Sequence, residues 1–456
     1  MTARHPDFIM NLESIVEKFK EQLQKQGAPE FEIFLLKENR AEVEVKEQKV
    51  HSFESAETVG AGLRLIRQKR LGSSYTTDFT DAAVAKAVEE ALATARYPSE
   101  NEFLRFPSPS KNPSNQTLRN YDKKVTQVTQ AQRIEQAMLL ERSALGFDPK
   151  IKRVRGASYD ASSYEILLAN SWGLQARHQK TMNVLSLMAV AEQGGEAEAA
   201  FDFEFSNFFD SLDAEKVGRR AAEKAARYLG GKPGPTLKCP ILLDALVAAE
   251  ILEVLAPSFY ADNLAKKCSL FEGLQGKKVL SEALTIIDDG LLDGGFVSSP
   301  FDGEGVSRQR MKVVEKGVFR QILADTEYGN RLGMGSTGSS VREDIKKAPR
   351  IGCSNFFIEK GTRSPEEILK KIDRGVLITE LIGMHTANPI SGDFSVGAQG
   401  FLVEKGEVAG PIKQIALSGN LKEMMQKVTE AASDLRFYFK VGAPSLLISE
   451  MDVAGE

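Results

Sequence analysis

Apolar residues recur at helical spacing at the start of the chain and then at alternate positions. In "NLESIVEKFKEQLQKQG" (11–27) they fall on every third or fourth residue, which predicts an amphipathic helix that ends at Gly27. From Phe31 to Thr76 apolar and polar residues alternate, which is the period of a half-buried strand, with turns predicted near "KENR" and "RQKRLG". The chain is therefore predicted to begin with a helix followed by a meander of strands.

The same two periods continue through the first half of the chain. "DAAVAKAVEEALATAR" predicts a second helix, closed by Pro98, and residues 98–122 are rich in Pro, Ser and Asn, which predicts a long loop. Helices are also predicted at about 127–146 and at about 213–229, and the alternating pattern between them predicts further antiparallel strands.

Glycines and prolines in close order mark a boundary at "LGGKPGPTLKCP" (229–240), because they disfavour both a helix and a central strand. Beyond it, short β-like runs punctuated by glycine predominate. A chain of 456 residues is long enough for more than one core. We therefore predict an α+β protein with a mixed α/β N-terminal domain (1–229) and a β-rich C-terminal domain (240–456).

Composition excludes several classes of partner. Hydrophobic residues make up 42% and charged residues 27%, as in a globular protein, and the net charge of −4 is spread along the chain. No positive field exists to attract a nucleic acid, so no direct nucleic-acid partner is expected. Three widely spaced cysteines indicate neither a disulfide framework nor a sulfur-rich zinc site, which favours the cytoplasm. No apolar run is long enough to predict a membrane span.

The segment "EILEVLAPSFYADN" (250–263) carries the candidate chemistry. Asp244 is a plausible N-cap for an almost wholly apolar helix, which should be buried and should end at Pro257. Zinc peptidases of the H-E-x-x-x-H kind hold the metal with two histidines and use the glutamate as a general base. Leu252 and Pro257 stand at the histidine positions and offer no lone pair, so no metal is expected. For Glu253, we favour a buried or edge carboxylate with a hydrogen-bond partner over a catalytic role.

Other candidates are weaker. His385 lies near Asp393 and Ser395, but no nucleophile elbow is present, and a loop histidine is favoured over a hydrolytic triad. "GMGSTG" (333–338) is interpreted as a turn. The acidic stretch 288–305 is interpreted as acidic turns at strand ends rather than a cation site. Cys353 is interpreted as a packing residue.

Several blocks together resemble one known family. "GDFSVGAQGFLVEKGEVAGPIKQIALSGNLKEMM" (392–425) is similar to the signature of the PmbA (TldE) branch of the TldD/PmbA family. The blocks that agree in the same order are "VGAGLRLIRQKRLGSSYT", "DDGLLDGG", "FDGEG", "EKGVFRQILADTEYGNRLG" and "STGSSVR". The resemblance spans nearly the whole chain, and an ordered set of blocks is far more specific than any single one.

The resemblance implies a division of labour between two subunits. The TldD branch is a zinc peptidase with a H-E-x-x-x-H helix and a cysteine ligand near its C-terminus, and it acts on extended or unfolded peptides. PmbA-type subunits lack these ligands and pair with TldD as a heterodimer. Here Leu252 and Pro257 match the histidine positions, Glu253 matches the glutamate, and no cysteine follows Cys353.

The leading hypothesis is therefore a subunit that is catalytically silent on its own and whose TldD-type partner holds the zinc in a heterodimer. The isolated chain is expected to be a homodimer. Two alternatives stay open. One is a free-standing peptidase or hydrolase that uses Glu253, His385 or the acidic stretch. The other is a non-enzymatic modulator of DNA gyrase, as an older description of the family has it, or of a toxin-antitoxin system.

Overall fold

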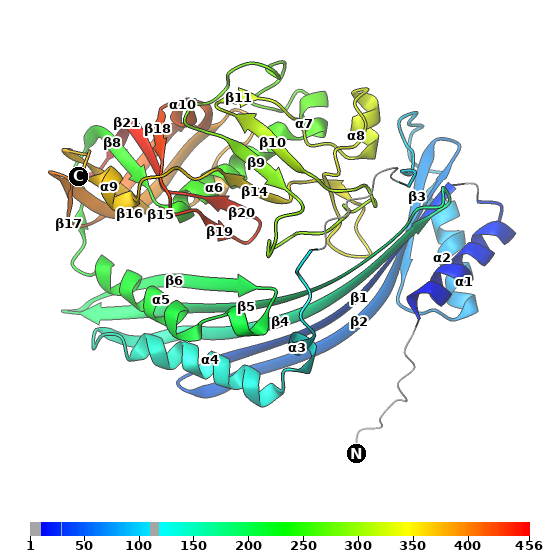
Figure 1. Cartoon of the computed structure of the whole chain (residues 1–456), viewed down its shortest axis with the longest axis horizontal. Helices are drawn as coiled ribbons and strands as arrows, with labels where there is room; N and C mark the ends of the chain where they lie inside the picture. The colour runs from blue at the N-terminus through cyan, green and yellow to red at the C-terminus, as the bar shows by residue number, and fades with distance from the viewer. Residues whose placement is uncertain (1–10, 29, 110–117) are drawn as a thin grey trace.

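A long curved sheet forms the N-terminal half of the molecule (Figure 1). The computed structural model describes residues 11–28, 30–109 and 118–456. The sheet is antiparallel throughout, in the order β3-β2-β1-β4-β5-β6. Its strands are β1 (Glu30–Lys46), β2 (Lys49–Arg67), β3 (Arg70–Thr76), β4 (Ile151–Asn170), β5 (Gln175–Gln193) and β6 (Glu196–Ser206).

The predicted meander is present, but the turn predicted near "KENR" is wrong. Strand β1 runs straight through these residues because it is paired on both sides, Lys37 lying opposite Val59 on β2 and Glu165 on β4. Cross-strand ion pairs accommodate the polar side chains: Lys37 Nζ lies 3.0 Å from the Glu57 carboxylate, and Arg40 lies 3.3 Å from Asp160. The charged side chains that predicted a turn therefore find their partners on the neighbouring strands.

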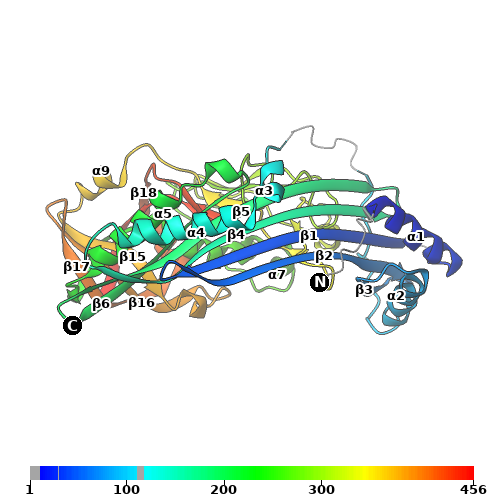
Figure 2. The same cartoon turned by 90° about the horizontal axis from the view of Figure 1, so that it is seen from below.

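Helices cover one face of this sheet. Strand residues alternate between faces, so Ile33 and Leu35 pack under the first two helices, whereas Phe34 packs on the opposite face against Ile345 of the C-terminal half. In Figure 2 helices α4 (Gln130–Leu145) and α5 (Ala214–Tyr228) lie along the strands. The helices are α1 (Leu12–Lys25), α2 (Asp81–Thr94), α4 (Gln130–Leu145) and α5 (Ala214–Tyr228).

The helices of the N-terminal half were predicted with small errors at their ends. Gly27 has φ 63°, as a residue that ends a helix does, directly after α1. The helix predicted at about 127–146 is α4, which begins at Gln130 because Thr129 caps it in a capping box with Gln132; a short helix that was not predicted, α3 (Lys123–Gln127), precedes it. In the predicted loop 98–122, residues 110–117 lie outside the described residues, and the described parts contain no helix or strand.

The C-terminal half contains two larger sheets and a short pair, which confirms the α+β class. In the first sheet, ordered β18-β21-β8-β15-β16-β17-β7, an additional pairing of β17 with β21 closes β21, β8, β15, β16 and β17 into a ring. The strands are β7 (Lys232–Pro233), β8 (Leu237–Leu243), β15 (Arg374–Ile382), β16 (Asp393–Glu404), β17 (Glu407–Asn420), β18 (Val428–Ala431) and β21 (Leu446–Ala454).

The second sheet has the order β11-β10-β9-β14-β20-β19. Its strands are β9 (Ile286–Asp289), β10 (Arg310–Glu315), β11 (Val318–Phe319), β14 (Asn355–Ile358), β19 (Arg436–Tyr438) and β20 (Val441–Ala443), and a separate pair is formed by β12 (Ser340–Val341) and β13 (Arg350–Ile351). The remaining elements are α6 (Ala245–Leu255), α7 (Ala261–Ala265), α8 (Thr326–Arg331), α9 (Pro365–Leu369), α10 (Leu421–Gln426) and the 3-10 turns η1 (Phe209–Ser211), η2 (Ala256–Phe259) and η3 (Met384–Thr386).

The two halves meet on the concave side of the long sheet, opposite the helices α4 and α5 (Figure 1). Helix α6 packs into the core that the closed ring and the second sheet share. No helix within the described residues is both long and apolar enough to cross a membrane.

Candidate functional site

Helix α6 has the ends that its sequence predicts. The carboxylate of Asp244 accepts a hydrogen bond from the backbone N–H of Val247 at 2.9 Å, which confirms the predicted N-cap. The helix ends at Leu255, and Pro257 lies in the 3-10 turn η2 that follows. Since proline has no N–H and its ring crowds the preceding turn, Pro257 cannot continue the helix.

The residues at the two positions where a zinc peptidase has histidines cannot bind a zinc ion. The side chain of Leu252 is fully buried in the core and has no donor atom. Pro257 has none either, and among the described residues no group of three His, Cys, Asp or Glu side chains is placed to hold a metal. Cys353, the last cysteine, is buried in the same core, as its interpretation as a packing residue requires.

Glu253 differs from its favoured interpretation. Its side chain is exposed and accepts no hydrogen bond from the described residues. The sequence predicts a buried or edge carboxylate with a hydrogen-bond partner instead. The reason is its position on the helix: Glu250 and Glu253 are three residues apart, so they share the one face of α6 that is turned away from the core. This face lines a cavity.

The cavity, of about 480 Å³, lies between the two halves of the molecule. We call it the α6 cavity. Strands β5 and β6 and helix α5 contribute its N-terminal wall; α6, β15, β16 and the region of β19 contribute its C-terminal wall. Glu253 is thus placed at an interdomain cavity, where substrate sites commonly lie.

Carboxylates gather on the C-terminal wall. Burial, followed by repulsion from Asp244, Glu380 and Glu253, raises the pKa of Glu250 to about 7. Burial likewise raises the pKa of Asp244 to about 7, although the N–H of Val247 opposes the shift. Burial also raises the pKa of Glu380 on β15. Groups with such shifted pKa values, close together in one cavity, are typical of a functional site.

The opposite wall holds one buried acid among cations. Asp202 on β6 is 1% exposed, and its carboxylate lies 2.8 Å from Lys224 Nζ and 3.1 Å from Arg220 Nη2, both on α5. Arg436 on β19 also donates to it. Burial alone would raise the pKa of Asp202, but Lys224 and Arg436 outweigh burial and hold that pKa below its ordinary value. This cluster ties β6 to the C-terminal half beside the α6 cavity.

Aromatic rings line the cavity next to this cluster. Phe439 stacks on Phe203 with ring centroids 4.6 Å apart, and Phe201 also stacks on Phe203, at 5.9 Å. Phe201 and Phe439 are 46% and 44% exposed, which is unusual for phenylalanine. Strand β6, which carries Phe201 and Phe203, pairs only with β5 among the described strands. An apolar surface and a free strand edge therefore lie together.

The structure does not bring His385 and Asp393 into this site. His385 is exposed in the turn η3. Asp393 is exposed at the start of β16 and accepts a hydrogen bond from Asn420 Nδ2 at 3.0 Å. No hydrogen bond joins His385 to Asp393 or Ser395 within the part of the chain that the structure describes, so the arrangement of a hydrolytic triad is not formed.

The acidic stretch 288–305 is structural, although more deeply buried than turns at strand ends usually are. Asp288 is 1% and Asp302 3% exposed. Asp288 accepts from the N–H and hydroxyl of Ser354, and Asp302 accepts from three backbone N–H groups. Gly333, Gly335 and Gly338 have φ between 68° and 76°, which agrees with the turn predicted for "GMGSTG".

Several residues that line the α6 cavity were not identified as candidates from the sequence. Glu250 had a local signal, since it lies one helical turn before Glu253. Glu380, Asp202 and Phe439 had none, because they reach the cavity from segments far apart in the chain.

Comparison with known proteins agrees with these features. Models of the PmbA/TldA metallopeptidase domain 1, central domain and C-terminal domain match residues 31–95, 123–229 and 236–455. The chain is 29% identical over 404 residues to Metalloprotease PmbA of Escherichia coli O157:H7, a match that covers 87% of this chain and 85% of that protein.

Two crystal structures share the fold. TldE from Thermococcus kodakarensis superposes with a TM-score of 0.89 at 25% identity, covering 97% of this chain and 100% of that one. A Thermotoga maritima protein described as a candidate modulator of a DNA gyrase superposes with a TM-score of 0.89 at 27% identity, again covering 97% and 100%. On this evidence the chain belongs to the PmbA/TldD metallopeptidase family.

Proposed function

We propose that this chain is a PmbA/TldE-like subunit that completes the substrate channel of a TldD-type zinc metalloprotease and does not hold the zinc itself. One observation carries the proposal. The two metal-ligand positions are a buried leucine on α6, Leu252, and a proline in the turn η2 that follows it, Pro257, while Glu253 on α6 faces the α6 cavity. The helix keeps its place in the fold without the chemistry of a metal site.

The surroundings of α6 support a role in binding peptide. The free edge of β6 offers main-chain hydrogen bonds to an extended peptide, whatever its sequence. Phe201 and Phe439 offer apolar contact beside that edge. The carboxylates of Glu250, Glu253 and Glu380 favour a peptide with basic groups at this wall. Unfolded or extended segments are the substrates that this arrangement suits.

The test is to mix the purified chain with the H-E-x-x-x-H homologue from the same genome. We expect one complex of the two chains by size-exclusion chromatography with light scattering, zinc only in the fraction that contains the homologue, and faster cleavage of an unstructured peptide by the complex than by either chain. A chelator should abolish that cleavage. Absence of a complex, together with unchanged cleavage, would contradict the proposal.

The chain alone separates this proposal from a free-standing hydrolase. We expect no stoichiometric zinc and no cleavage of the same peptide by the isolated chain, and Glu253→Gln should leave that background unchanged. Cleavage by the isolated chain that Glu253→Gln removes would favour the free-standing hydrolase. The three free cysteines, Cys239, Cys268 and Cys353, fit the cytoplasmic location that we propose with the subunit role.

A second candidate function rests on the name of a relative, since the Thermotoga maritima protein is described as a candidate modulator of a DNA gyrase. A gyrase supercoiling assay with and without the purified chain tests it. A change in supercoiling that does not require the zinc subunit would favour this function over the proposed one.

A further inference from the structure

A second interdomain cavity, of about 350 Å³, lies under the strands of the long sheet and shares no lining residue with the α6 cavity. We call it the Lys180 cavity. His178 and Lys180 are two residues apart on β5, so both side chains leave the same face of the sheet and enter it. The loop that contains Phe296 and Phe301 covers them from the C-terminal half.

Lys180 has no acidic partner. Its ammonium donates to the backbone carbonyl of Phe296 and lies 5.5 Å from the centroid of the Phe296 ring. No carboxylate within the described residues forms an ion pair with it. Burial, followed by the positive charge of Arg308, lowers the pKa of Lys180 to about 7. An ammonium has three donors, so this one retains capacity for a further acceptor.

Arg308 is the second cation of the cavity, and one of its donors is free. The side chain is 8% exposed; Nε donates to the carbonyl of Phe301 at 3.3 Å, and Nη2 donates to the carbonyl of Ser340 at 3.4 Å. Nη1 is buried and has no hydrogen-bond partner among the described residues. A buried donor on a charged group without an acceptor costs stability, which calls for an explanation.

The acids that line the Lys180 cavity are engaged elsewhere. Asp302 accepts from the backbone N–H groups of Glu304, Val306 and Ser340. Burial, followed by the charge of Glu304, raises the pKa of Asp302 to about 7, and the charge of Arg308 opposes this rise. No hydrogen bond joins Arg308 to Asp302 within the described residues. Glu343 binds Lys347 and Arg350.

The remaining charged side chains are paired or neutral, although Arg342 Nε is buried without a hydrogen-bond partner among the described residues. Arg342 binds Glu32 at 2.6 Å. His178 lies 3.2 Å from the side-chain nitrogen of Asn120, and burial, followed by the charge of Lys180, lowers the pKa of His178 to about 4. The rest of the lining is largely apolar: Phe34, Leu36, Ile166, Met182 and Val297. A small apolar chamber thus ends in two cations, Lys180 and Arg308, neither of which forms a direct ion pair with a described carboxylate; the charge of Arg308 is opposed at longer range by Asp288 and Asp302.

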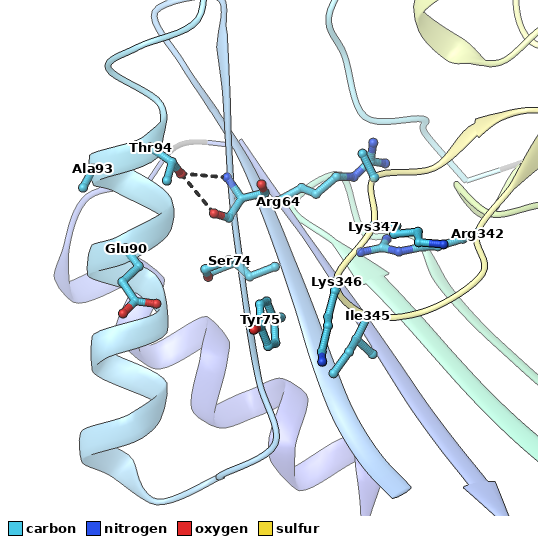
Figure 3. Close-up of a pocket in the computed structure, with 13 residues that line it drawn as sticks. Arg64, Ser74, Tyr75, Glu90, Ala93, Thr94, Arg342, Ile345, Lys346 and Lys347 are labelled. Atoms are coloured by element: carbon cyan, nitrogen blue, oxygen red, sulfur yellow. Dashed lines mark hydrogen bonds between the residues drawn. The ribbon is translucent and has the colours of Figure 1, made fainter.

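The cavity in Figure 3 provides a contrast. It measures about 420 Å³ and lies between α2, β3 and residues 342–348, with the side chains of Arg64 and Arg342 on one side. Both arginines form ion pairs with Glu32, so their charges are already balanced within the protein. Lys346 stands at this cavity in an exposed position, 5.4 Å from the centroid of the Tyr75 ring. It is a matched control for Lys180.

We propose that the Lys180 cavity binds an organic carboxylate with a small apolar body. The carboxylate accepts hydrogen bonds from Lys180 Nζ and Arg308 Nη1, and the apolar body lies against the side chains of Phe34, Ile166 and Met182. A free monocarboxylate and the C-terminal residue of a peptide share this chemistry. The inference does not depend on the subunit role proposed above.

Isothermal titration calorimetry of the full chain tests the proposal with four probes: hexanoate, N-acetyl-Ala-Leu with a free carboxylate, the amide of that dipeptide, and inorganic phosphate. Binding of hexanoate alone supports a free carboxylate as the ligand. Binding of the dipeptide acid but not its amide supports a peptide C-terminus. Binding of neither acid, equal binding of the dipeptide acid and its amide, or binding of phosphate alone overturns the proposal.

Variants locate the binding. Lys180→Met should weaken binding of the carboxylate by at least about tenfold, because a charged hydrogen bond in a dry cavity is lost. Lys346→Met should leave it unchanged. Equal affinity of Lys180→Met and the unmodified chain overturns the proposal.

The unmodified chain offers a readout that requires no substitution. Binding should be tighter at pH 6 than at pH 8.5, because Lys180 loses its charge and Asp302 gains one as the pH rises through about 7. This pH dependence should shrink in Lys180→Met, which retains only the contributions of Asp302 and of Asp288, whose pKa burial raises to about 6 and which also interacts with Arg308. Affinity that does not fall between pH 6 and pH 8.5 overturns the proposal, even where Lys180→Met does not fold.

Discussion

At the scale of single residues, Glu250 is the clearest case of a side chain whose ionisation its surroundings oppose. Its pKa is raised from 4.5 to about 7 by burial and by the neighbouring acids. The folded protein therefore binds this proton more tightly than the unfolded chain does. Its contribution to stability is present in full below about pH 4.5 and is lost as the pH rises to about 7.

We predict that Glu250→Gln raises the melting temperature at pH 8 and flattens its decline between pH 5 and pH 8, because the amide has no charge to bury. Differential scanning fluorimetry across this pH range measures both. Glu423→Gln, an exposed glutamate on α10, is the control and should change neither value. Melting curves of Glu250→Gln that match the unmodified chain at every pH would contradict the expected repulsion.

At the scale of elements, α6 is held by packing rather than by metal. Leu252 is fully buried against both C-terminal sheets. We predict that Leu252→Ala lowers the free energy of unfolding by about 2–5 kcal/mol, through lost burial and the void that remains. Guanidinium chloride titration measures it.

Leu246→Ala on the same helix is the matched control, because Leu246 is only partly buried and lines the α6 cavity. Its cost should be clearly smaller than that of Leu252→Ala, since water fills the space left at the cavity wall. Equal costs at the two positions would show that burial does not hold this helix in place.

At the scale of the whole molecule, two buried ionic clusters join the halves. In the first, Glu32 on β1 accepts hydrogen bonds from Arg64 Nε on β2 at 2.9 Å and from Arg342 Nη1 of the C-terminal half at 2.6 Å. Glu304 of the C-terminal half lies 3.5 Å from Arg64. Burial alone would raise the pKa of Glu32, but the two arginines hold it below its ordinary value.

We predict that Glu32→Gln lowers the free energy of unfolding by about 3–5 kcal/mol, because Arg342 loses its buried counter-charge and Arg64 keeps only Glu304. Glu282→Gln removes an exposed partner of Lys278 and should cost far less, because water screens this ion pair. Denaturant titrations at neutral pH compare the two variants. A cost for Glu32→Gln as small as that of the control would mean that the cluster does not stabilise the contact between the halves.

The second cluster, around Asp202, predicts a local effect. Asp202→Asn should speed amide hydrogen exchange in β6 and β19, because Arg436 then loses its charged partner across the interface. Mass spectrometry of peptides from both strands measures it. Asp210→Asn, which removes an exposed partner of Lys124, should leave both strands unchanged. Exchange in β19 that is insensitive to Asp202→Asn would contradict the proposed tie between the halves.

The sequence by itself determined most elements of the N-terminal half and the ends of α6. Helix and strand periods depend on neighbouring residues, so α1, α2, α5 and the long strands could be predicted, as could the cap at Asp244 and the end of α6 before Pro257. The turn predicted near "KENR" is absent because β2 and β4 pair with β1 through these residues, and a local pattern does not show such pairing.

Only the tertiary structure decided which side chains meet and which reach solvent. Glu253 is exposed because one face of α6 is turned toward an interdomain cavity, and no local pattern shows this. Glu380 joins Glu250 from a distant strand, and Lys180 and Arg308 meet across the two halves. Burial and electrostatic interaction depend on distance in space, so chemistry that depends on them is set by contacts between segments that are remote in the chain.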